Sequence, residues 1–148
     1  MKLTRASDYA IRGVVYMAMQ DAGAIVVIPE VAREMDVPVG FLARIFQSLS
    51  RAGIVISHRG KKGGYSMARK PEEITLCDVV EAVEGDIRLN ICLDGYEACQ
   101  RMSYCPVRKE LVKVQEDLVA SLARTNFAEL AERERRHRQS LPLTAQAK

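Results

Sequence analysis

Aromatic residues and long apolar runs are scarce in this sequence. Only 5% of the 148 residues are aromatic and none is tryptophan, whereas 48% are hydrophobic, so a buried core has to be aliphatic. No stretch approaches the roughly 18 apolar residues of a membrane-spanning helix, and residues 1–13 carry charge where a signal peptide needs an apolar run. These absences argue against a membrane partner. They predict a cytoplasmic protein of one domain, or of one domain with an oligomerisation arm.

The sequence holds four cysteines, and its basic charge is unevenly spread. In the cytoplasm, the four cysteines are expected to be thiols or metal ligands rather than disulfides. Residues 1–70 hold 11 Lys and Arg against 5 Asp and Glu, a net charge of +6, whereas residues 71–148 hold 11 against 14, a net charge of −3. A basic first half is typical of a nucleic-acid-binding module, although an ordinary solvated surface can show the same imbalance.

Three helices followed by a hairpin are expected in the first seventy residues. The apolar spacing changes from a helical to a strand-like period after Gly53, which ends the third helix as a cap. A glycine-rich turn at residues 60–64 joins the two strands. The expected helices and strands cover residues 7–20, 29–35, 39–52, 54–59 and 65–68. The fold class is therefore mainly α with a small β-hairpin wing, a winged helix-turn-helix.

The second half is predicted to form helices joined by a long loop. Residues Thr75 to Asp78 resemble a capping box that opens a fourth helix, and residues 85–105 show no clear period. Pro106 opens a long helix that reaches about Arg124. Its apolar residues are spaced four, three and four apart, as on a dimer seam. These seam residues are Val107, Leu111, Val114 and Leu118.

A last helix, capped near Asn126 and almost wholly charged from Glu132 to Arg138, precedes a tail that is expected to be disordered. The expected organisation is a DNA-binding domain over residues 1–70, a cysteine loop with dimerisation helices over 71–138, and a disordered tail over 139–148.

The third helix and the wing together form a candidate DNA interface. A helix fits the major groove, where base edges are distinguishable, and a basic wing can reach phosphates or the minor groove. Each part alone occurs in many proteins that bind no DNA, but their order and the charge asymmetry favour DNA binding. The candidate contact residues are Gly40, Ala43, Arg44, Gln47, Arg51, Arg59, Gly60, Lys61 and Lys62.

Three cysteines lie in the irregular stretch before the long helix. Cys92, Cys99 and Cys105 are separated by six and then five residues, which is not the spacing of a zinc ribbon. Because Cys105 directly precedes a helix, the helix dipole favours its thiolate. This clustering favours a metal or redox role over ordinary reduced cysteines. Cys77, in the fourth helix and off its main apolar stripe, is interpreted as structural.

Several motifs resemble the Rrf family of bacterial winged-helix regulators: MKLT at residues 1–4, DYA at 8–10, GIV at 53–55 and RGKKGGY at 59–65. The family includes an iron–sulfur cluster regulator, a nitric-oxide-sensitive repressor and a cysteine-metabolism repressor. The resemblance implies a homodimer with crossing long helices that binds a palindromic double-stranded DNA operator. Members that bind known operators often carry polar or charged side chains where this chain has Gly40 and Ala43. The base sequence that this chain recognises is therefore left open.

The same resemblance implies an iron–sulfur cluster, either 2Fe-2S or 4Fe-4S, held by Cys92, Cys99 and Cys105. The first gap is one residue longer than is usual in the family. Arg108 occupies the position where one member has a histidine ligand, and arginine cannot ligate. Asp8 is then the candidate fourth ligand from the other subunit, as in the nitric-oxide-sensitive repressor. A carboxylate that stabilises the first helix turn is an equally weighted alternative for Asp8.

These features predict a DNA-binding transcriptional regulator, a repressor, whose operator affinity depends on the cluster or on the redox state of the three-cysteine loop. One alternative is a cluster-free winged-helix repressor that responds to thiol chemistry or to a partner protein. An alternative of another class is a small iron–sulfur electron carrier, against which the basic wing argues. An enzyme is not expected, because no nucleophile–base pair or phosphate-binding loop is present.

Overall fold

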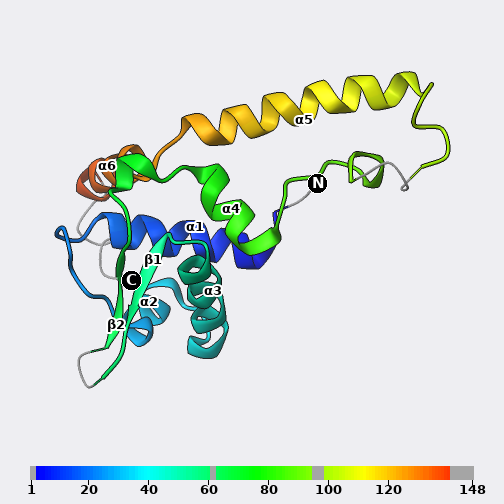
Figure 1. The fold of residues 1–148 in the computed structure, drawn as a ribbon. Coiled ribbons are helices and arrows are strands. Elements are labelled where there is room, and N and C mark those ends of the chain that lie inside the picture. Colours follow the sequence, from blue (N-terminus) through cyan, green and yellow to red (C-terminus); the bar gives the residue numbers. More distant parts are fainter. Residues whose placement is uncertain (1–2, 61–62, 95–98, 141–148) are drawn as a thin grey trace.

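The computed structural model describes residues 3–60, 63–94 and 99–140, and it forms a helical body with one small hairpin (Figure 1). The fold is the predicted one, mainly α with a β-hairpin wing. The helices are α1 (Arg5–Ala18), α2 (Ile28–Met35), α3 (Val39–Arg51), α4 (Leu76–Glu84), α5 (Pro106–Arg124) and α6 (Phe127–Ser140). The strands are β1 (Val55–His58) and β2 (Gly64–Met67), and the short 3-10 helices are η1 (Pro71–Glu73) and η2 (Ile91–Leu93). No helix in these described ranges is both long and apolar enough to cross a membrane.

Side-chain caps determine where two of the helices begin. The hydroxyl of Thr4 accepts a hydrogen bond from the Ser7 backbone N–H, so α1 begins two residues before the predicted start. At α4 the predicted capping box is present, because Thr75 accepts from the Asp78 backbone N–H and the Asp78 carboxylate accepts from the Thr75 N–H. Both helices therefore start at fixed points relative to the core beneath them.

The main hydrophobic core joins residues from both halves of the chain. Phe46 of α3 is fully buried, and Gly13 of α1 lies so close that a Cβ atom there would come within 3.0 Å of the Phe46 ring. Phe127 and Ala131 of α6 belong to the same core, at 0% and 1% exposure. The last helix is thus packed against residues 1–70.

The hairpin is anchored to the helices by one additional backbone bridge. Strands β1 and β2 pair antiparallel, with Val55 opposite Met67. Val26, from the apolar stretch before α2, exchanges two backbone hydrogen bonds of 2.8 Å with Tyr65 of β2. Gly64 permits this approach, because a Cβ atom there would collide with the Val26 carbonyl. The wing is therefore a fixed extension of the core.

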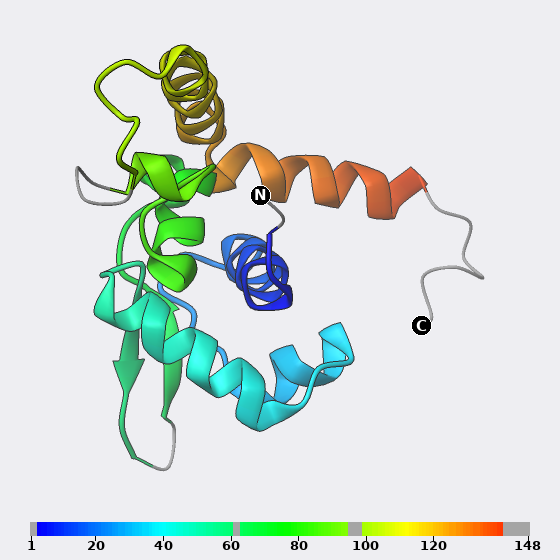
Figure 2. The same cartoon turned by 90° about the vertical axis from the view of Figure 1, so that its right-hand side faces the viewer.

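Helix α5 lies on the opposite side of the molecule from α2, α3 and the hairpin, as both views show (Figures 1 and 2). None of its residues is buried. Leu118, Val119 and Leu122 contact a small second core under α4, formed by Cys77, Val80 and Ile87. The loop with the three cysteines joins α4 to the outer end of α5.

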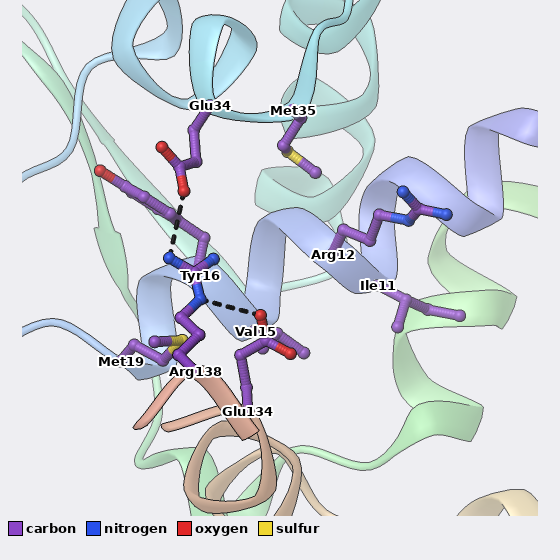
Figure 3. Close-up of a pocket in the computed structure, with 9 residues that line it drawn as sticks. All are labelled: Ile11, Arg12, Val15, Tyr16, Met19, Glu34, Met35, Glu134 and Arg138. Atoms are coloured by element: carbon purple, nitrogen blue, oxygen red, sulfur yellow. Dashed lines mark hydrogen bonds and ion pairs between the residues drawn. The ribbon is translucent and has the colours of Figure 1, made fainter. Parts of the chain in front are cut away.

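Two arginines of α6 hold α1 and α2 in place. Arg135 donates to the carbonyls of Ala18 and Met19 at the end of α1, each at 3.2 Å. Arg138 pairs with Glu34 of α2 and with Glu134, beside a pocket of about 380 Å³ between α1, α2 and α6 (Figure 3).

The end of α6 differs from the expected one. The helix continues through Ser140, two residues into the 139–148 segment that was expected to be disordered, and residues 141–148 lie outside the described ranges.

Candidate nucleic-acid interface and cysteine loop

The outward side of α3 presents most of the predicted contact residues. Gly40, Arg44, Gln47 and Arg51 are exposed, and a Cβ atom at Gly40 would meet no atom within 4 Å. Ala43 differs from the prediction, because it is half-buried and packs against the core rather than standing clear of it. The exposed face is therefore polar and basic from Arg44 to Arg51 and open at Gly40.

The described part of the wing tip, Arg59 and Gly60, is basic and exposed. Arg59 and Gly60 are both exposed, and Gly60 has a φ of 103°, a conformation that favours glycine. Behind the tip, a hydrogen bond of 2.8 Å between the His58 ring and the buried Ser66 hydroxyl ties the two strands together. Lys61 and Lys62, the other predicted wing contacts, lie outside the described residues.

Two apolar residues at the start of α3 were not predicted as part of this interface. Val39 is 48% exposed and Phe41 is 39% exposed, on either side of Gly40. The Phe41 ring makes an edge-to-face contact with Tyr9 of α1, with ring centroids 5.9 Å apart. The sequence does hold a signal for them, because both lie outside the buried stripe of α3 and yet are large and apolar.

The three loop cysteines are all free and half-buried. Cys92 lies in η2, and Cys105 directly precedes Pro106 as the N-cap residue of α5. The guanidinium of Arg108 donates to the carbonyl of Cys92 at 3.2 Å, which ties the loop to the first turn of α5. Arg108, at the position where the resemblance implies a histidine ligand in one family member, therefore supports the loop backbone.

Asp8 lies in the first turn of α1, and its exposed carboxylate pairs with Arg12 at 3.0 Å. Within the described residues, no three Cys, His, Asp or Glu side chains come together in a group that could hold a metal. The donor chemistry nevertheless fits an iron–sulfur cluster, since three free thiols of one loop are the ligands that iron prefers. The ligand set consequently stays a prediction.

Cys77 is a different kind of thiol. It is 7% exposed in the small core under α4. Burial raises the pKa of the Cys77 thiol, and the carboxylates of Glu81 and Asp78 raise it further. A buried thiol that resists ionisation is a poor ligand and a poor nucleophile, in agreement with the structural role predicted for it.

Comparisons with known proteins indicate the family of this chain. A family profile described as "Rrf2: Iron-dependent Transcriptional regulator" matches residues 3–133. Protein aau3 of Rhizobium meliloti (strain 1021) is 37% identical over 114 residues, which cover 76% of this chain and 73% of that protein. The oxidized form of Staphylococcus aureus CymR is 25% identical with a TM-score of 0.69, covering 89% of this chain and 97% of that one. IscR of T. potens is 19% identical with a TM-score of 0.75, covering 98% and 96%, and so shares the fold.

Proposed function

Because this chain belongs to the Rrf2 family of transcriptional regulators, we propose that it represses transcription as a homodimer whose three-cysteine loop controls its affinity for operator DNA. One combination of features carries this proposal. The same chain has an exposed basic helix and wing and three free thiols near the start of α5, a helix with no buried residue. The family is one of regulators and not of enzymes, as predicted, and it gives no support to the electron-carrier alternative.

The DNA contacts divide between base edges and phosphates. Arg44, Gln47 and Arg51 project from α3 and carry donors that suit guanine and adenine edges in the major groove. Arg59 and Gly60 at the wing tip, with Lys61 and Lys62, contact phosphates or the adjacent minor groove. Ala43 contributes little to base reading, because it is half-buried against the core.

A homodimer follows from the unpartnered face of α5. Val107 and Val114 are 62% and 54% exposed on the predicted seam, and apolar residues at that spacing pack against a second helix. A twofold dimer presents two α3 helices to half-sites about one DNA turn apart, so its operator is palindromic. Residues 1–70 are the DNA-binding part in this proposal, and residues 71–138 connect it to the partner.

The loop is proposed to hold an iron–sulfur cluster, 2Fe-2S or 4Fe-4S, through Cys92, Cys99 and Cys105. Asp8 of the partner subunit is the proposed fourth ligand, and Arg12 has to release that carboxylate before it can ligate. The bound group would supply chemistry that responds to oxygen, nitric oxide or iron shortage. Because Asp8 lies in the first turn of α1, its capture or release bears directly on the helix that packs against α3.

A second candidate keeps the DNA binding but replaces the cluster by a thiol switch or a partner protein. The similarity to CymR of Staphylococcus aureus, whose structure is known in an oxidized form, favours it. Half-buried free thiols near a helix start are also the kind that oxidants reach. This candidate predicts DNA affinity that changes with peroxide in iron-free protein.

Iron and sulfide content of anaerobically purified protein separates these candidates. Wild type is expected to be brown and to bind iron and sulfide in cluster stoichiometry, and Cys92→Ala is expected to lose both. Cys77→Ala is the matched control, because it removes a buried thiol and should keep the cluster. Colourless, iron-free wild type would overturn the cluster and leave the thiol switch.

The DNA interface is tested in the same preparations. Arg59→Ala is expected to weaken binding of all duplexes and to reduce the salt dependence by about one phosphate contact. Arg124→Ala removes the same charge at the far end of α5 and serves as control. Equal affinities of the two variants would contradict the proposed interface.

A further inference from the structure

The first turn of α3 exposes apolar surface where the rest of its outward side is polar. Phe41 is 39% exposed, although the four buried residues of the helix (Leu42, Ile45, Phe46 and Leu49) show that the adjoining core is accessible to apolar side chains. At 100° per residue, Phe41 lies at the edge between the buried stripe and the outward Arg44. An aromatic ring at this edge can contact a ligand that covers the outward side of α3.

The Phe41 ring is held in place from behind by α1. The edge-to-face contact with Tyr9 has an interplanar angle of 87°, so one part of the ring is covered and its orientation is restricted. A restricted ring loses little side-chain entropy when it meets a ligand. Gly40, with no atom within 4 Å of its Cβ position, leaves the approach on the adjacent side open.

Charge identifies what covers this surface. Arg44 and Arg51 share the outward side with Gln47, no acidic residue lies in the first turn of α3, and Arg59 lies at the tip of the neighbouring wing. Figure 2 shows α3 along the lower side of the molecule beside the hairpin, with no other described element beneath it. A polyanion that also offers an apolar group therefore fits, and in the DNA major groove that group is the C5-methyl of thymine.

We propose that Phe41 is a specificity-determining residue that contacts a thymine methyl group in each operator half-site. The proposal rests on the proposed DNA-binding function and deepens it by naming a base. Arginine and glutamine on α3 select guanine and adenine edges, whereas the Phe41 ring selects thymine over cytosine through the methyl. It also gives a reading role to the part of α3 where Gly40 and Ala43 offer no polar group.

The test replaces thymine by uracil, which removes only the methyl group. Duplexes are first selected from a random-sequence pool with the full-length protein, and each thymine of the selected site is then replaced by deoxyuridine in turn. One position per half-site is expected to bind wild type about fourfold more weakly, the factor that burial of one methyl group implies. In Phe41→Ala the same replacement is expected to have no effect.

Two further variants keep this test interpretable. Phe41→Leu retains an apolar side chain and is expected to keep part of the uracil effect. Val39→Ala truncates the other exposed apolar residue of the same turn, on the opposite edge of the helix, and is expected to keep all of it. Circular dichroism verifies that each variant is folded.

The outcomes distinguish the role of Phe41 from DNA binding by the protein. Selected duplexes that bind equally well with thymine or uracil at every position overturn the role of Phe41 and leave DNA binding intact. A uracil effect that persists at full size in Phe41→Ala overturns it as well, because another residue then reads the methyl. Failure to retain any duplex from the pool overturns the proposed function and this inference together.

Discussion

Glu84 joins the end of α4 to the start of α1. Its carboxylate accepts a hydrogen bond of 2.8 Å from the Thr4 backbone N–H and another from the hydroxyl of Ser7, which is fully buried. The Ser7 hydrogen bond is the main cause of a lowered pKa for Glu84. The next residue, Gly85, opens the segment that leads to the cysteines, so one side chain connects that segment to the first turn of α1.

Replacing Glu84 by Gln is expected to lower the free energy of unfolding by about 1 kcal/mol near neutral pH, the value of a charged hydrogen bond reduced for its exposure to solvent. Because the pKa of Glu84 lies below its ordinary value of 4.5 in the folded protein, the carboxylate contributes its full stability above that pH. The contribution is lost as the pH falls through the lowered pKa. Urea denaturation should therefore show the difference between wild type and variant shrinking as the pH falls below 4.5, and a constant difference would count against the hydrogen bonds.

Gly64→Ala tests the anchoring of the wing. The added Cβ collides with the Val26 carbonyl, so the bridge between Val26 and Tyr65 has to open, at an expected cost of about 2 kcal/mol in unfolding free energy. Gly40→Ala is the matched control, since nothing lies near its Cβ position and alanine is the better helix former by up to about 1 kcal/mol. Chemical denaturation compares the two variants, and equal stabilities would refute the collision.

At the scale of elements, α6 clamps two helices of the first half of the chain, α1 and α2. Arg135 binds two carbonyls at the end of α1, a helix that has no basic residue in its own last turn. A cation placed there satisfies carbonyls that lack an intrahelical partner and favours the helix dipole.

Arg135→Ala is accordingly expected to lower the unfolding free energy by about 1 kcal/mol. Arg136→Ala, which removes only an exposed pair with Glu132 one turn away, is expected to cost about 0.3–0.5 kcal/mol. Thermal unfolding of both variants measures the contrast. A larger loss in Arg136→Ala than in Arg135→Ala would contradict the clamp.

Local sequence patterns predicted most of the helices and strands. The features that these patterns did not predict depend on long-range contacts. The capping box at Thr75 and the extent of α5 from Pro106 to Arg124 follow from caps and periodicity within a few residues. The packing of Phe127 into the main core and the bridge of Val26 to Tyr65 depend on residues far apart in the chain, which periodicity does not describe.

The site was predicted less completely than the fold. Charge and glycine patterns led to α3 and the wing, but Phe41 was passed over because an apolar residue in a helix is usually assigned to the core. Its place outside the buried stripe of α3 is a signal in the sequence, whereas its 39% exposure is seen in the structure. For the cysteines, spacing indicated a common role, whereas ligand geometry depends on the path of the loop in space.

At the scale of the whole molecule, the exposed side of α5 predicts a dimer. Val114→Glu places a charge on the exposed seam and is expected to yield a folded monomer, since no residue of α5 is buried in the single chain. Affinity for a palindromic duplex should fall by about a hundredfold once the two half-sites are no longer engaged together. Ala120→Glu adds the same charge at an exposed position away from the seam and should leave the dimer intact. Light scattering measures the mass of each variant, and a monomeric wild type would disprove the seam.

The central claim is that the three-cysteine loop controls DNA affinity. Its most direct test is the dissociation constant of one selected duplex for anaerobic protein with its iron and sulfide restored, compared with the same protein after chelation. Wild type and Cys77→Ala are expected to change affinity by about tenfold or more, and Cys92→Ala is expected to show no change. Identical constants for restored and chelated wild type would contradict control of DNA affinity by a cluster held in this loop.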